Sequence, residues 1–97
     1  QFMRCYHRSW GRHLARTWAA AGNHEYETPG AAGHFEYFGE RAGPHGRGFY
    51  AYDLGAWHVI TLNSNIPIGA GSPQYQWLRA ELQALRSPCV AAIYHHP

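Results

Sequence analysis

Two short groups of polar side chains are the parts of this sequence whose residue types could carry chemistry. The first is Gly22-Asn23-His24-Glu25, which follows a short apolar stretch of tryptophan and alanines. It brings an amide oxygen, an imidazole and a carboxylate together at the expected end of a strand, where sites accumulate in α/β sheets. The glycine would let the backbone approach a crowded site. Such groups are suited to holding a metal ion and to moving a proton.

The second group is Tyr94-His95-His96-Pro97, which closes a continuous apolar run near the other end of the chain. Neighbouring side chains of an extended segment diverge, so one residue of each adjacent pair can hold an ion while the other faces a substrate. Two histidine-bearing strand ends therefore predict a metal-assisted active site, or part of one. The alternatives are a surface turn capped by Asn23, and a surface histidine pair or the start of an expression tag.

Composition restricts the class of protein. The chain has 97 residues, of which 45% are hydrophobic and 15% aromatic, enough for a core in one domain or a piece of one. A net charge of +2 with scattered arginines gives no basic stripe for nucleic acid and no strong attraction to an anionic membrane. No run approaches the ~20 apolar residues of a membrane span. Histidine is the one unusual count, with eight residues.

The first half of the chain predicts irregular structure around one strand. Residues 1–16 carry an arginine at every fourth position, which predicts a loop or a short helix with a solvated basic face. Residues 17–21 predict a strand. Residues 26–47 contain so many glycines and prolines that they predict a long loop. Four aromatic side chains would pin that loop to the core: Tyr26, Phe35, Tyr37 and Phe38.

The second half predicts a hairpin and a further strand. Residues 49–52 and 57–62 are rich in aromatic and β-branched side chains, and Asp53-Leu54-Gly55 between them supplies the turn. Residues 89–94 form an unbroken apolar run, which is typical of a strand buried on both faces. His58 lies within the hairpin and the remaining histidines lie in expected loops, so we expect structural roles for them: His7, His13, His34 and His45.

One helix is predicted between the hairpin and the last strand. Ser72 is a candidate N-cap and Pro73 fits the first helical position. A single apolar stripe would face the core: Tyr75, Leu78, Leu82 and Leu85. The expected order is strand, long loop, hairpin, helix and strand, and the fold class is α/β.

These motifs resemble the calcineurin-like metallophosphoesterases, and most closely their purple-acid-phosphatase-like bacterial branch. That family carries a Gly-Asn-His-Asp/Glu block, which Gly22-Asn23-His24-Glu25 matches letter for letter. It also carries a strand that ends in histidine, which Ala92-Ile93-Tyr94-His95 matches, with Ala92 in place of the usual valine. The resemblance covers residues 1–97. It implies an αββα sandwich of mixed β-sheets, of which this chain would supply part.

The resemblance also implies roles for individual residues. Two metal ions, of iron, manganese or zinc, would lie together, and Asn23 and His95 would both ligate the second. His24 would contact the phosphate and help to protonate the leaving oxygen, while His96 would line the substrate side. Glu25 would orient the region around His24. The ions would activate a water molecule for attack on a phosphate ester, and metal and imidazole would neutralise charge on the phosphoryl oxygens.

Several blocks of that family are missing. The sequence contains no Asp-x-His, no Gly-Asp-x-x-Asp and no Gly-His-x-His, and its one aspartate, Asp53, lies in a predicted turn. We therefore expect residues 1–97 to be the central segment of a larger domain. Flanking segments would complete both the sheet and the metal site. The chain alone should lack useful phosphatase activity and should be marginally stable or associate.

Two other interpretations remain beside the enzyme segment. The chain could be a non-catalytic, histidine-rich module that binds a metal or another ligand, and flanking sequence would separate this from the enzyme. A basic, aromatic surface for nucleic acid is disfavoured by the charge. The resemblance favours a secreted or periplasmic location, since relatives of this branch are often exported. Cys5 and Cys89 either stay free or form one long-range disulfide.

Overall fold

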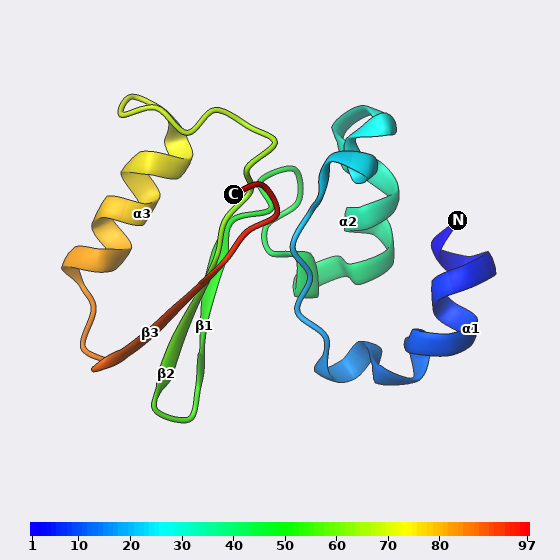
Figure 1. The fold of residues 1–97 in the computed structure, drawn as a ribbon, viewed down its shortest axis with the longest axis horizontal. Helices are drawn as coiled ribbons and strands as arrows, with labels where there is room; N and C mark the ends of the chain where they lie inside the picture. The colour runs from blue at the N-terminus through cyan, green and yellow to red at the C-terminus, as the bar shows by residue number, and fades with distance from the viewer.

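A three-stranded mixed sheet forms the centre of the molecule in the computed structural model, which describes residues 1–97 (Figure 1). The strand order is β1 (Tyr50–Leu54), β2 (Trp57–Thr61) and β3 (Cys89–Ile93). β1 and β2 form the predicted antiparallel hairpin, and Gly55 takes a positive φ of +60° in its turn. The turn is Gly55-Ala56 rather than the predicted Asp53-Leu54-Gly55, because Asp53 and Leu54 still pair with β2. β2 and β3 run parallel, with Trp57 opposite Cys89. The fold class is therefore α/β, as predicted.

The parallel pair decides where the polar groups gather. Because β2 and β3 run in the same direction, the segments that follow them leave the sheet at the same end. The pairing continues one step beyond the strands, since the Leu62 amide donates to the Ile93 carbonyl at 2.9 Å. Residues after Thr61 and after Ile93 consequently lie side by side.

Helix α3 (Pro73–Gln83) connects β2 to β3 and starts where the sequence predicts. The Ser72 hydroxyl accepts a hydrogen bond from the Tyr75 amide at 3.2 Å, and proline occupies the first turn. Figure 1 shows α3 on one side of the sheet and the N-terminal helices on the other.

The predicted apolar stripe of α3 is only partly correct. Tyr75 and Leu82 are 42% and 49% exposed, whereas the one buried residue of the helix is Gln74. The helix meets the body of the molecule through the Trp77 ring, which packs on Phe49 with 5.2 Å between ring centroids, and through the Gln74 amide. Local periodicity identified the helix but not the face that its neighbours cover.

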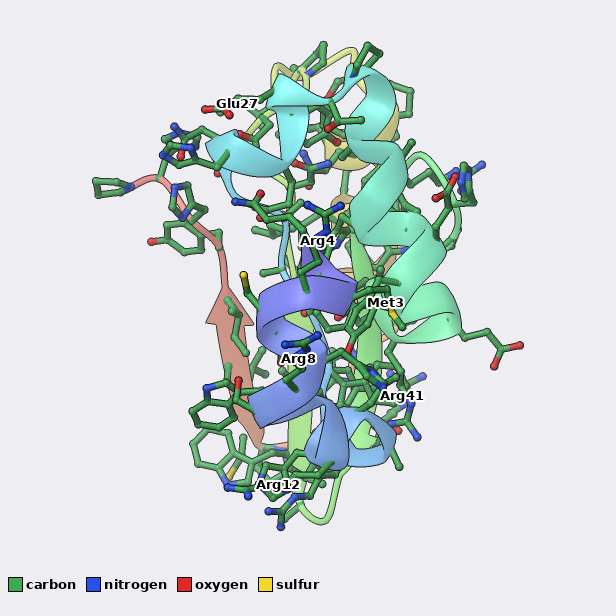
Figure 2. The ribbon with its side chains drawn as sticks, turned by 90° about the vertical axis from the view of Figure 1, so that its right-hand side faces the viewer. Met3, Arg4, Arg8, Arg12, Glu27 and Arg41 are labelled. Carbon is green, nitrogen blue, oxygen red and sulfur yellow. The ribbon has the colours of Figure 1, made fainter.

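The N-terminal segment forms successive helical turns, in agreement with the loop or short helix expected for residues 1–16. The turns are η1 (Phe2–Tyr6), α1 (His7–Ser9) and η2 (Trp10–Arg16). Figure 2 shows Arg4, Arg8 and Arg12 along one side of this segment, as their spacing predicts. All three are exposed, and the ion pairs of the molecule involve histidines rather than arginines, so this side is a solvated face.

The strand predicted for residues 17–21 is wrong. The segment is extended, but its backbone hydrogen bonds run from the Thr17 amide to the Leu14 carbonyl, at 3.1 Å, and from the Ala19 amide to the Arg41 carbonyl, at 2.8 Å, rather than to a strand. Side chains hold it against the sheet instead. The Trp18 ring stacks on Tyr52 at 4.4 Å between centroids, and the Tyr50 hydroxyl donates to the Ala19 carbonyl at 2.8 Å. Apolar composition predicted burial correctly for Ala19 and Ala21 but not for Trp18, which is 38% exposed, and a strand also needs a partner.

The long loop predicted for residues 26–47 is also wrong. This region contains α2 (Ala32–Phe38), and Gly30 at φ +63° and Gly39 at φ +54° lie on either side of that helix rather than inside it. Shorter 3₁₀ turns surround it: η3 (Asn23–Glu27), η4 (Pro29–Ala31) and η5 (Gly39–Ala42).

Aromatic side chains of this region build the main core, as predicted. Phe35 and Phe38 are buried, with Tyr26 and Tyr37 packed partly buried against them. The buried cluster is completed by three alanines: Ala19, Ala31 and Ala42.

Strand β3 is not buried on both faces. It lies at the edge of the sheet with β2 as its one neighbour, and Val90 and Ile93 are 39% and 46% exposed. β2, in the middle, buries Val59, Ile60 and Thr61. Cys5 and Cys89 are both free thiols. None of the helices has the length and apolar character that crossing a bilayer requires.

Candidate functional site

The two side chains predicted to share a metal ion lie in contact. The Asn23 amide oxygen Oδ1 and the His95 ring nitrogen Nε2 are 2.8 Å apart, although 72 positions separate them in the chain. Asn23 opens the turn η3, and His95 follows the end of β3. Both residues are exposed, so the pair is accessible from solvent.

Gly22 makes room for this pair. Its φ of −98° is open to any residue, so the need for glycine here is one of space. A Cβ atom at position 22 would lie 3.0 Å from Glu25 Oε2 and 3.3 Å from the His95 ring. The Gly22 amide donates to Glu25 Oε2 at 2.7 Å, so the carboxylate closes the turn that carries Asn23. Whether Glu25 also orients His24 stays a prediction.

A tripeptide that sequence reasoning treated only as the end of a strand holds both segments of the pair. We call Asn63-Ser64-Asn65 the clamp. Asn65 Nδ2 donates to the Ala21 carbonyl at 3.0 Å, two residues before Asn23. The Ser64 hydroxyl accepts the His96 backbone amide at 3.1 Å and lies 2.8 Å from His96 Nδ1.

Asn63 anchors the clamp from inside the molecule. It is fully buried, and its Nδ2 donates to the Tyr26 hydroxyl at 2.7 Å and to the Arg47 carbonyl at 2.8 Å. Its Oδ1 accepts from Asn65 Nδ2 and from the Asn65 amide, each at 3.1 Å. Its own amide and carbonyl pair with the Gln74 side chain at 2.7 and 2.9 Å. A buried network in which each of these polar groups is paired is rigid as well as stable.

His24 points to a different neighbour from the pair. Its Nδ1 lies 2.8 Å from Glu27 Oε1, and both side chains are largely exposed, so the ion pair itself contributes little stability. His24 lines a cleft of about 420 Å³ together with Glu25, Glu27 and His34, which we call the polar cleft. Its predicted contact with a phosphate therefore depends on the free Nε2 nitrogen.

His34 was expected to be a loop histidine but is a buried residue of α2. It is 3% exposed, and its Nε2 has no hydrogen-bond partner. Burial lowers the pKa of its imidazole, and the nearby Glu25 carboxylate opposes part of that shift. Sequence reasoning missed it because glycines on both sides of α2 concealed the helix.

His58 lies outside the site, in β2, and its side chain is 14% exposed. Its Nδ1 contacts Asp53 at 2.7 Å, and its Nε2 lies 2.9 Å from Glu81 of α3 without the alignment of a hydrogen bond. The hydrogen bond to Asp53 is the main cause of its raised pKa, which desolvation reduces and the Glu81 carboxylate reinforces.

Asn23 and His95 fit one part of a metal site. Two donors that share an octahedral ion at about 2.1 Å stand about 3 Å apart, which is close to the 2.8 Å found between their donor atoms. An amide oxygen and an imidazole are also acceptable ligands for iron, manganese or zinc. No group of three or more histidine, cysteine or carboxylate side chains is placed to hold a metal ion, however. The pair can supply two ligands, and a tightly held ion needs more.

Comparison with known proteins agrees with this chemistry at a coarse level. The chain is 30% identical over 56 residues to purple acid phosphatase 21 of Arabidopsis thaliana. The aligned part is 55% of this chain and 13% of that protein, so the match concerns a small portion of the relative. No protein-family model matches the chain, and no solved structure matches it. The similarity indicates a metallophosphoesterase-like relationship.

Proposed function

We propose that this chain is the central segment of a metal-dependent phosphoesterase, and that the complete protein hydrolyses phosphate esters. The observation that carries the proposal is the 2.8 Å approach of Asn23 Oδ1 to His95 Nε2, from motifs 72 positions apart in the chain. The partial similarity to a purple acid phosphatase supports the same reaction class.

In this proposal Asn23 and His95 hold one ion of a two-metal site of iron, manganese or zinc. When bound, the ions supply positive charge for the phosphoryl oxygens and lower the pKa of coordinated water. His95 must then offer the Nε2 lone pair, with its proton on Nδ1. Further ligands would have to come from outside residues 1–97, since no third metal-ligating side chain of this chain stands beside the pair.

The other histidines act on the substrate. Glu27 engages His24 Nδ1, so Nε2 is the nitrogen left to contact the phosphate and to give a proton to the leaving oxygen. Ser64 engages His96 Nδ1 in the same manner, so His96 also presents Nε2. Glu25 keeps the turn closed through the Gly22 amide.

The test uses the protein expressed from the complete reading frame that contains this sequence. Asn23→Ala and His95→Ala should each lower metal content and reduce kcat on an aryl phosphate by about 100-fold or more, since removal of groups that merely support metal ligands already costs 10–100-fold. His45→Ala is the matched control, because this exposed histidine lies in a separate loop. Unchanged metal content and turnover in both site variants would refute the proposal.

The second candidate is a non-catalytic, histidine-rich module. It is favoured by the exposure of His24, His95 and His96, which leaves their rings accessible to a ligand. A complete reading frame without the missing aspartate and Gly-His-x-His blocks, together with metal binding and no turnover, would establish this reading instead.

A further inference from the structure

The candidate site has a second, chemically different neighbour on the His96 side. A pocket of about 300 Å³ lies between the start of α3 and the segments that follow β2 and β3. No charged side chain lines it. Its walls include Leu62, Ile68, Tyr75, Leu78, Tyr94 and His96, and we call it the apolar pocket.

The apolar pocket lies close to the Asn23–His95 pair, although neither member of the pair lines it. His96 lines the pocket, and its ring centroid lies 4.8 Å from that of His95. Ser64 holds His96 in place from the clamp. A molecule whose phosphate reaches the pair could therefore place its organic part in this pocket without leaving the surface.

The polar cleft on the His24 side is a poor place for the same organic part. It is lined by polar and charged side chains, among them Glu25 and Glu27, which an uncharged apolar group would desolvate without offering them a partner. By contrast, Ile68 is 66% and Tyr94 53% exposed at the apolar pocket, so covering them with an apolar group is favourable. The two flanks thus give a bound ester one preferred direction.

We propose that the apolar pocket receives the uncharged, apolar alcohol portion of the phosphate ester, an aryl group of one or two rings. This proposal rests on the proposed function and specifies its substrate class. A cavity of about 150 Å³ takes a benzene molecule, so the size of this pocket suits one or two rings. Polyphosphorylated or strongly cationic groups would be desolvated there without a partner.

The test measures inhibition of the complete protein by phenylphosphonate and by methylphosphonate, neither of which can be hydrolysed as an ester. Phenylphosphonate should bind at least about tenfold more tightly, since even one methylene in an apolar pocket can contribute that factor. In the double variant Ile68→Ser/Tyr75→Ser the ratio should fall close to one, with methylphosphonate binding unchanged. Leu82→Ser, which replaces an exposed leucine of α3 outside the pocket, should keep the full ratio.

The outcomes separate this inference from the proposed function. If the protein hydrolyses phosphate esters but binds the two phosphonates equally, the inference is overturned and the function stands. If the double variant loses thermal stability but keeps the ratio, Ile68 and Tyr75 serve the packing of the protein and not the binding of the ligand. That result also overturns the inference. A third outcome is that no ester is hydrolysed with any metal, yet calorimetry detects a preference for phenylphosphonate that depends on Ile68 and Tyr75. The proposed function then fails, and the pocket remains a binding site for anions that carry an apolar group.

Discussion

Residues 1–48 and residues 49–97 hold themselves together in different ways, and each half supplies one atom of the candidate site. The helical half packs aromatic rings around Phe35 and Phe38. The sheet half uses a hydrogen-bonded ladder and the buried amide of Asn63. Asn23 comes from the first half and His95 from the second. The geometry of the site therefore depends on how the halves are joined as much as on either half.

The same contrast appears in two histidines. His34 in the helical half is buried without a partner for Nε2, which lowers its pKa, whereas His58 in the sheet half lies between two carboxylates, which raise its pKa. One half penalises a protonated imidazole and the other favours it. The two halves should therefore respond to acid in opposite directions.

The largest expected effect breaks the helical half. Phe35→Ala removes a ring that is 2% exposed and should cost about 3–5 kcal/mol of unfolding free energy, because truncation of a buried aromatic leaves a cavity. Urea unfolding followed by near-UV circular dichroism measures this. Trp10→Ala is the control, since Trp10 is 62% exposed and its loss should stay within about 0.5 kcal/mol. Equal costs for the two variants would contradict an aromatic core centred on α2.

A smaller effect is expected where the halves are joined. Asn63→Leu removes the donors to Tyr26 and to the Arg47 carbonyl, leaving part-buried acceptors unpaired, and should cost about 2–3 kcal/mol. The same unfolding assay measures it, with exposed Gln83→Leu as the control. A stability loss no greater than that of the control would show that the clamp is not a structural link.

The sequence predicted those features whose signals are local. Gly55 marked the hairpin, and Ser72 with Pro73 marked the start of α3. It failed where the outcome depends on distant neighbours: residues 17–21 lack a partner strand, and β3 lacks a second one. Glycine density concealed α2, because glycines at helix ends and within loops look alike in a sequence.

The candidate site was predictable to a similar extent. Asn23 and His95 were found because each follows an apolar run and belongs to a recognisable motif. The clamp was missed because its hydrogen bonds join residues far apart, such as Asn63 to Tyr26 and Asn65 to Ala21. Side-chain bonds of this kind have no periodicity. The one available signal was three small polar residues directly after a strand of β-branched residues.

Asn65→Ala weakens the link between the two halves without creating a cavity in the core. It removes the donor to the Ala21 carbonyl and to Asn63 Oδ1 and should cost about 1–2 kcal/mol, the usual net contribution of two hydrogen bonds. In the complete protein, the free energy of metal binding should decrease by more than the free energy of unfolding, since Asn23 would be less well positioned. Asn65→Gln can keep the donor and should partly restore metal affinity. A uniform decrease in both properties would indicate a purely structural role.

The smallest expected effect is the pH dependence. The raised pKa of His58 stabilises the fold below its unfolded value of about 6.5, and this contribution is lost as pH rises through the folded pKa. The lowered pKa of His34 leaves the unfolding free energy unchanged above about pH 6.5. As pH falls below that value the unfolding free energy decreases, because the unfolded chain takes up the proton first.

Urea midpoints between pH 5 and pH 8 test these signs. Relative to the parent protein, the loss of unfolding free energy in His58→Gln should be largest at pH 5. The loss of unfolding free energy in His34→Leu should be smallest at pH 5, where the parent itself is destabilised by its buried histidine. His45→Gln, an exposed histidine, should run parallel to the parent throughout. Parallel curves for all three variants would remove the electrostatic difference between the halves.

The outer edge of β3 has a consequence for handling the protein. With β2 on one side alone, this strand presents unpaired amides and carbonyls along its free side, next to the exposed Val90 and Ile93. Such an edge accepts any extended chain that reaches it. At high concentration, molecules of residues 1–97 should therefore associate by pairing of their β3 edges. Val90→Lys should keep the molecules apart by charge while leaving the end of the sheet that carries His95 unchanged.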